Sequence, residues 1–121
     1  MTSVDDPEKD QKLSAYFDGC EAIGITALII DSQGILYDSV KHLNAKGIRV
    51  PGQLSLVVYD DLPEVQSVLP VQLTTVGPDL TGLARTMVDL VTAKADEASD
   101  GLWLTETVST QLIVRNSTRA I

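Results

Sequence analysis

The sequence has a single cysteine, few aromatic residues and no long apolar run. Because Cys20 has no second cysteine to pair with, an intramolecular disulfide is excluded, which is compatible with a reducing cytoplasm. Only 4% of the residues are aromatic, so the core must consist mainly of Leu, Val, Ile and Ala. No apolar run approaches the roughly 20 residues of a membrane-spanning helix, and the acidic start MTSVDDPEKD is no signal peptide. We therefore expect a soluble, cytoplasmic protein without membrane contact.

Basic residues are also scarce. The chain has 9 Lys and Arg against 17 Asp and Glu, a formal net charge of -8, so we expect no direct nucleic-acid contact. His42 is the only histidine, and the sequence contains neither a nucleophile-elbow motif nor a Gly-rich phosphate loop. We therefore predict a protein that is not an enzyme and holds no cofactor. His42 is expected to be solvated on a helix, Cys20 to fill the core, and Trp103 to pack in the core or at an edge.

With 121 residues, the chain has the length of one domain, and its hydrophobic periodicity predicts alternating helices and strands. The runs ITALII and LSLVVY are short, apolar and β-branched, which is typical of strands buried on both faces. A helix between them completes a parallel βαβ unit, so the expected fold is α/β, three-layered, with a mostly parallel sheet. The expected elements are a disordered tail over residues 1–6, a helix over 7–22, a strand over 25–30, a helix from 31 or 32 that ends at Gly47, a strand over 54–59, a short helical turn after Asp61, a strand over 73–76, a helix over 78–93, a polar linker over 95–101 and a strand over 107–115.

Polar residues follow both strands of the predicted βαβ unit at their carboxyl ends. Asp31 and Ser32 follow the first strand, and Asp60 and Asp61 follow the second. Ligands of open parallel sheets bind beyond the carboxyl ends of the strands, so we expect these side chains to converge at one edge. Two other interpretations stay open from the residues alone. In the first, the side chains cap the following helix or turn. In the second, Asp31, Asp60 and Asp61 hold magnesium as in a receiver domain, although the chain after Asp61 is shorter than a receiver domain requires.

Three blocks of the sequence resemble one family of proteins. The blocks are GIRVPGQLSLVVYDD (47–61), LPVQLTTVGPDLTGLARTMVDLV (69–91) and QLIVRNST (111–118), and they resemble the C-terminal part of LacI/GalR-type transcriptional regulators. The family pattern is G-(L/I)-R-V-P-x-D-(I/V)-S-(V/L)-(V/I)-G-(F/Y)-D-(D/N), then P-x-L-T-T-(V/I), a long helix and a final (L/V)-(V/I)-x-R-x-S-T strand. The resemblance covers residues 25–118 and implies a lobe of a periplasmic-binding-protein-like sensor, which binds a sugar-like or nucleobase-like effector between two lobes.

The resemblance also implies roles for individual residues. Asp60 matches the family aspartate that hydrogen-bonds the effector, and an ionised carboxylate can accept two strong hydrogen bonds from vicinal hydroxyls or N–H donors. Ser32 matches a second position that contacts the ligand, while Asp61 is expected to orient the loop or cap a turn. Two departures are that Val58 stands where the family has Gly and that Gln33 replaces a usual aspartate.

Residues 7–121 are thus expected to form the C-terminal portion of the sensor, without the DNA-binding domain, the hinge or the first half of the cleft. The parent regulator would be a homodimer that binds DNA. In this family the helix over 78–93 and the last strand cross into the other lobe, so we expect the chain to self-associate through their apolar surface. The alternative function is a stand-alone dimerisation module that binds no ligand.

Overall fold

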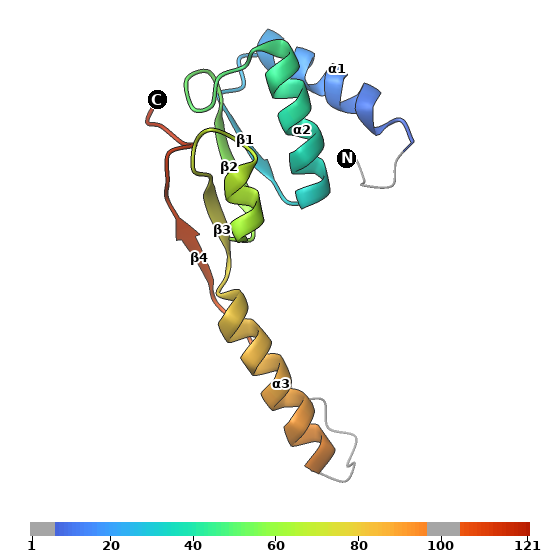
Figure 1. Ribbon diagram of the computed structural model, residues 1–121, viewed down its shortest axis with the longest axis vertical. Helices are drawn as coiled ribbons and strands as arrows, with labels where there is room; N and C mark the ends of the chain where they lie inside the picture. The colour runs from blue at the N-terminus through green and yellow to red at the C-terminus, as the bar shows by residue number, and fades with distance from the viewer. Residues whose placement is uncertain (1–6, 97–104) are drawn as a thin grey trace.

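The computed structural model describes residues 7–96 and 105–121 (Figure 1). The predicted order of helices and strands is confirmed, and the largest difference is the last strand, which is four residues long instead of nine. The expectations for residues 1–6 and Trp103, and most of the linker, fall outside the described residues. The elements are α1 (Lys9–Ala22), β1 (Ala27–Ile30), α2 (Gln33–Lys46), β2 (Ser55–Tyr59), the 3-10 helix η1 (Pro63–Ser67), β3 (Thr74–Pro78), α3 (Leu80–Asp96) and β4 (Thr110–Ile113).

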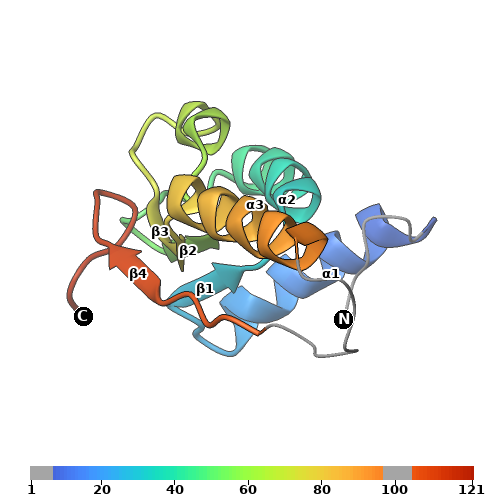
Figure 2. The ribbon, with the colours of Figure 1, turned by 90° about the horizontal axis from the view of Figure 1, so that it is seen from below.

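The four strands form one sheet in the order β1-β2-β3-β4. β1, β2 and β3 are parallel, and β4 pairs with β3 in the antiparallel direction. Figures 1 and 2 show β1 at one edge of the sheet and β4 at the other. The predicted α/β class with a mostly parallel sheet is confirmed.

Helix α2 shows how the sequence pattern leads to local structure. Leu36, Val40 and Leu43 recur at helical spacing, and all three are buried against the sheet. Gly47 ends the helix in the left-handed conformation, at φ +65°, and its N–H donates to the carbonyl of Asn44. The predicted stop at Gly47 is therefore confirmed, since glycine adopts this conformation without the steric cost of a side chain.

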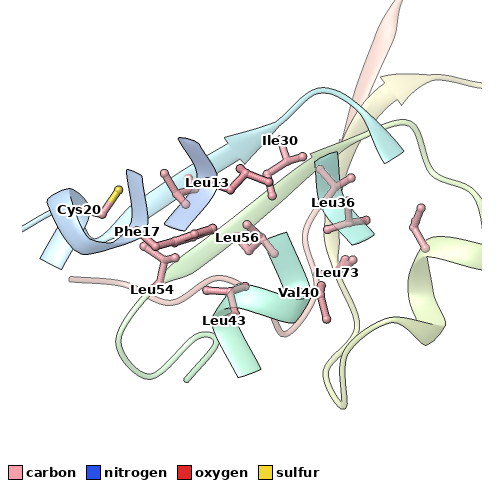
Figure 3. Packing of buried hydrophobic residues seen from close by; sticks show 13 residues of the cluster. Leu13, Phe17, Cys20, Ile30, Leu36, Val40, Leu43, Leu54, Leu56 and Leu73 are labelled. Atoms are coloured by element: carbon pink, nitrogen blue, oxygen red, sulfur yellow. The ribbon is translucent and has the colours of Figure 1, made fainter. Parts of the chain in front are cut away.

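The core lies between one face of the sheet and the helices α1 and α2 (Figure 3). In β1 the side chains alternate, with Leu28 and Ile30 buried and Ile29 73% exposed. The prediction that this strand is buried on both faces is wrong, because helices cover only one face of it. Within the described residues, the second helical layer of the three-layer arrangement is not formed. The buried apolar residues are Leu13, Phe17, Cys20, Leu28, Ile30, Leu36, Val40, Leu43, Leu54, Leu56, Val58, Val65 and Leu73.

His42 is less exposed than its helical position predicts. Its side chain is 18% exposed, stacks on Phe17 with ring centroids 6.2 Å apart, and places Nε2 3.6 Å from Oδ1 of Asp10. The expectation of a solvated histidine is wrong, because α1 packs over α2 at this point. Cys20 is buried in the core, as predicted.

Helix α3 leaves the rest of the molecule at the end of β3 and extends away from it (Figure 1). Its contacts with the sheet are few and are made with β3, the strand that directly precedes it, and β3 pairs in turn with β4. Among the residues that the structure describes, no helix is both long and apolar enough to cross a membrane.

Candidate functional site

The candidate site is the edge of the sheet where the parallel strands β1, β2 and β3 end. The ladder pairs Ile30 of β1 with Val58 of β2. Each of Ser32 and Asp60 lies two residues beyond this pair, so they follow neighbouring strands at the same edge. Both residues that the sequence singled out as ligand contacts therefore lie at this edge of the sheet.

Asp60 has an unusual backbone conformation. Its φ angle is +68°, in the left-handed region, which Asp tolerates better than most residues but still at a steric cost. Its backbone N–H donates to the carbonyl of Val76, at 2.9 Å, so the conformation is held by the end of β3. Within the described part of the chain, no side chain or backbone group donates a hydrogen bond to the Asp60 carboxylate. This half-buried acceptor is therefore available to another molecule.

Gly77 in β3 packs directly against Asp60. A Cβ atom added to Gly77 would lie 3.1 Å from both Cα and Oδ1 of Asp60 and 3.2 Å from its backbone nitrogen. These distances are tighter than most van der Waals contacts of a Cβ atom, and two of the three contacted atoms are backbone, so a side chain at this position would have to displace Asp60 by a few tenths of an ångström. Sequence reasoning missed Gly77, although a glycine inside a strand is a known sign of close backbone approach.

Asp61 has the opposite role from Asp60, because its carboxylate is engaged inside the protein. Nη2 of Arg115 lies 2.8 Å from Oδ2 of Asp61, and Oδ1 accepts hydrogen bonds from Thr75 Oγ1 at 3.0 Å and Gln66 Nε2 at 3.2 Å. The Arg115 hydrogen bond, followed by those from Thr75 and Gln66, lowers the pKa of Asp61 despite its partial burial. Asp61 therefore orients the loop after β2, in agreement with the sequence-based expectation.

Arg115 connects three parts of the chain at this edge. Besides Asp61, its guanidinium donates to the carbonyl of Leu73 at 2.8 Å and to Oγ1 of Thr75 at 3.1 Å. Sequence reasoning assigned it no role, because its partner Asp61 lies 54 residues earlier. The only signal was the arginine in the last block of the family pattern.

Ser32 lies at the N-cap position of α2, but its hydroxyl does not cap the helix. Its backbone is extended, with φ -138° and ψ 131°, and the side chain makes no capping hydrogen bond. Asp60 does not cap a helix either, since the N-cap residue of η1 is Leu62. The interpretation of these two residues as simple caps therefore has no support from their contacts.

The acidic residues of this edge do not form a metal site in the described residues. No group of three His, Cys, Asp or Glu side chains there is arranged to hold a metal ion. Asp61 is bound by Arg115, so its charge is already compensated. A cavity of about 250 Å³ lies next to the edge, beneath the start of α3, and neither Asp60 nor Ser32 lines it. Its lining residues are Asp61, Thr75, Gly77, Pro78, Asp79, Leu80, Gln111 and Ile113.

Comparisons with known proteins agree on one kind of domain. A family model described as periplasmic binding protein-like domain matches residues 2–118. No curated protein sequence matches the chain. Among solved structures, a LacI-type transcription regulator from Bifidobacterium animalis subsp. lactis aligns over 92% of the chain with 25% identity and a TM-score of 0.72. The lac repressor dimer bound to operator and the anti-inducer ONPF aligns over 93% with 25% identity and a TM-score of 0.68.

A further solved structure is a LacI family regulator from Arthrobacter sp. FB24 in complex with lactose. It aligns over 93% of the chain with 22% identity and a TM-score of 0.68, which shows a shared fold. The chain spans 40%, 38% and 42% of the lengths of these three proteins. The alignment therefore covers nearly all of this chain but less than half of each regulator.

Proposed function

The chain belongs to the periplasmic-binding-protein-like domain family, in the form found in LacI-type transcription regulators, and on this premise we propose that it binds a small-molecule effector. In this proposal the chain forms part of the sensor of a transcriptional regulator that works as a homodimer. The effector is sugar-like or, as a second class, nucleobase-like. Binding takes place at the carboxyl edge of β1, β2 and β3.

The observation that carries the proposal is the state of Asp60. Its carboxylate has no donor within the described residues, although the backbone is held in the left-handed conformation by Val76 and Gly77. A costly conformation that presents an unpaired acceptor supports a role in recognition. An ionised carboxylate accepts two hydrogen bonds, which suits the vicinal hydroxyls of a sugar. The uncapped hydroxyl of Ser32, on the neighbouring strand end, adds a donor and an acceptor.

The relatives support a sugar-like effector as the first class to test. The regulator from Arthrobacter sp. FB24 was solved with lactose, and one lac repressor structure was solved with ONPG in the repressed state. The solved relatives are transcription regulators rather than enzymes, and the free carboxylate of Asp60 serves binding in this proposal, not catalysis.

The proposal can be tested by titrating the ¹⁵N-labelled chain with lactose, with other mono- and disaccharides and with free nucleobases, using NMR. We expect amide shifts confined to residues near Asp60, Ser32 and Gly77. Replacing Asp60→Asn should weaken the response about 10- to 150-fold, the equivalent of 1.5–3 kcal/mol for a hydrogen bond to a charged group. Asp89→Asn, which removes one negative charge from the exposed surface of α3, is the matched control and should leave the response unchanged.

Asn tolerates the left-handed conformation at least as well as Asp, so Asp60→Asn should leave the stability of the chain nearly unchanged. The proposal would be abandoned if Asp60→Asn unfolded the chain, because Asp60 would then be structural. It would also be abandoned if the shifts appeared elsewhere, for example around the cavity beneath α3, or if Asp89→Asn reduced them equally. Ser32→Ala should weaken the response by a smaller amount, about 0.5–1.5 kcal/mol.

A further inference from the structure

Asp60 and Asp61 carry the same side chain at adjacent positions, yet only Asp60 leaves its carboxylate free. Within the residues that the structure describes, no group donates a hydrogen bond to the Asp60 carboxylate. Three side chains donate to Asp61, namely those of Arg115, Thr75 and Gln66. Both carboxylates can accept the same hydrogen bonds, so either could serve the same ligand. A feature of the fold must therefore select which of the two is presented.

Arg115 is the only cation among the described partners of Asp61. Thr75 and Gln66 both donate to Oδ1 of Asp61, at 3.0 and 3.2 Å. Arg115 alone reaches Oδ2, at 2.8 Å. The pair is partly shielded from water, since the side chains of Arg115 and Asp61 are 21% and 30% exposed. Without Arg115, Oδ2 would lose its partner in the described chain, and the charge of Asp61 would lose its counter-ion.

The guanidinium of Arg115 is itself fixed by β3 and the residue before it. Its Nη1 donates to the carbonyl of Leu73 at 2.8 Å and to Oγ1 of Thr75 at 3.1 Å. The backbone N–H of Arg115 donates to Oγ1 of Thr74, at 2.9 Å. Because the guanidinium is planar and its donors have fixed directions, these bonds also set the direction of Nη2. Asp61 is thus tied to a group that the sheet holds in place.

The backbone conformation of Asp60 depends on this anchor. A residue with φ +68° is in a sparsely populated conformation, which persists only where the surrounding structure holds it. On one side, the N–H of Asp60 donates to the carbonyl of Val76, at 2.9 Å. On the other side, the next residue is Asp61, which Arg115 holds. If Asp61 were released, Asp60 could relax to an unstrained backbone conformation, and its carboxylate would no longer have one fixed direction.

We propose that Arg115 is a positioning residue of the effector site. It holds Asp61 inside the protein and thereby fixes the loop after β2, so that Asp60 alone presents its carboxylate at the edge of the sheet. This inference rests on the function proposed above and assigns a part in it to a residue that acts without touching the effector. If Arg115 only stabilised the fold, its removal would lower the free energy of unfolding and leave the affinity of the folded chain for the effector unchanged.

The first measurement needs no ligand. ¹⁵N relaxation of the full chain gives an order parameter for each backbone amide, which is about 0.85 for rigid and below about 0.6 for flexible backbone. We expect the amides of Asp60 and Asp61 to be rigid in the natural chain and to fall below about 0.6 in Arg115→Met. The control Arg119→Met removes the same charge from an exposed position close by in sequence and should leave both amides rigid.

The second measurement is the affinity of each variant for lactose as the probe, taken from the NMR titration. Arg115→Met should weaken it about 2- to 12-fold, the cost of ordering one mobile side chain on binding. Arg115→Lys should lie between Arg115→Met and the natural chain, because an ammonium group can pair with Asp61 but cannot replace all donors of the guanidinium. Leu43→Ala is the control for stability, since it lies in the core near the end of α2 and should leave the affinity unchanged.

Circular dichroism shows whether each variant is folded. If Arg115→Met is not folded, Asp61→Asn tests the same bridge from its other end, with a smaller loss of stability and the same direction of both effects. The inference is overturned if the Asp60 amide stays rigid when the bridge is removed. It is also overturned if Leu43→Ala weakens lactose binding as much as Arg115→Met does.

The two proposals fail in different ways. If lactose gives no response, or if Asp60→Asn leaves the response unchanged, the proposed function fails, and the effect of Arg115 on Asp60 is then decided by relaxation alone. If Asp60→Asn weakens the response and Arg115→Met does not, only the positioning role of Arg115 fails.

Discussion

The ion pair between Asp61 and Arg115 should contribute to stability in a way that depends on pH. Two substitutions remove it, Asp61→Asn and Arg115→Met. A hydrogen bond to a charged group is worth about 1.5–3 kcal/mol, and partial exposure of the two side chains, 30% and 21%, reduces this to about 1–2 kcal/mol for Asp61→Asn. Arg115→Met should cost more, about 2–4 kcal/mol, because it also removes the donors to Leu73 and Thr75.

The sign of the pH dependence follows from the direction of the pKa shift. Arg115, as the main cause, lowers the pKa of Asp61 in the folded state. The stabilisation is therefore fully present above the pKa of an unfolded-state Asp, about 3.9, and is lost as pH falls through the lower folded-state value. The difference in unfolding free energy between the natural chain and Asp61→Asn should be constant from pH 7 to about 5 and shrink below pH 4.

Urea unfolding followed by circular dichroism, at a series of pH values, measures these differences. A double-mutant cycle of Asp61→Asn and Arg115→Met isolates the direct interaction between these two side chains, for which we expect a coupling free energy of about 1 kcal/mol. The reasoning is refuted if Asp61→Asn is as stable as the natural chain at pH 7. It is also refuted if the difference stays constant down to a pH at which Asp61 must be protonated.

Three other predictions concern stability and can be measured by urea unfolding at neutral pH. Gly77→Ala should destabilise the fold by about 1–3 kcal/mol, because the new Cβ would lie too close to Asp60. The control Gly19→Ala, in α1, has open space around it and should leave stability unchanged or raise it by up to about 1 kcal/mol. Equal effects of the two substitutions would contradict the close approach of Gly77 to Asp60. Leu43→Ala should cost about 2–5 kcal/mol, since this side chain is 1% exposed in the core, and a loss below 1 kcal/mol would show that the site is not packed as described. Gly47→Ala should cost about 1–2 kcal/mol at φ +65°, and no loss would mean that the helix ends elsewhere.

Several features of the fold were predictable because they depend on residues close in sequence. The apolar spacing of Leu36, Val40 and Leu43 marks α2, and Gly47 marks its end. The runs that form β1 and β2, and the polar residues that follow them, are visible without any tertiary information. Because a helix connects these two strands, the expected pairing was parallel. The observed ladder, which runs from the pair Ala27–Ser55 to the pair Ile30–Val58, is parallel.

The candidate ligand-binding edge was predictable only in part. The position of Ser32 and Asp60 follows from the strand ends, and their roles as ligand contacts stay predictions that rest on the family resemblance. The left-handed backbone of Asp60 and its contact with Gly77 were not predictable. Both depend on how the end of β2 meets the end of β3, which local sequence does not encode.

The sequence by itself determined the order of the helices and strands, the parallel pairing and the location of the polar edge, since all of these follow from local periodicity and from short connections. Only the tertiary structure decided which of two adjacent aspartates is free. Asp61 is held by Arg115 across 54 residues, and Asp60 is left without a partner in the described chain. Only the tertiary structure, too, decided that Ile29 is exposed and that His42 is partly covered, because burial depends on which helix lies over each face. Local patterns report the preference of a residue to be buried, and the packing of distant segments determines whether that preference is met.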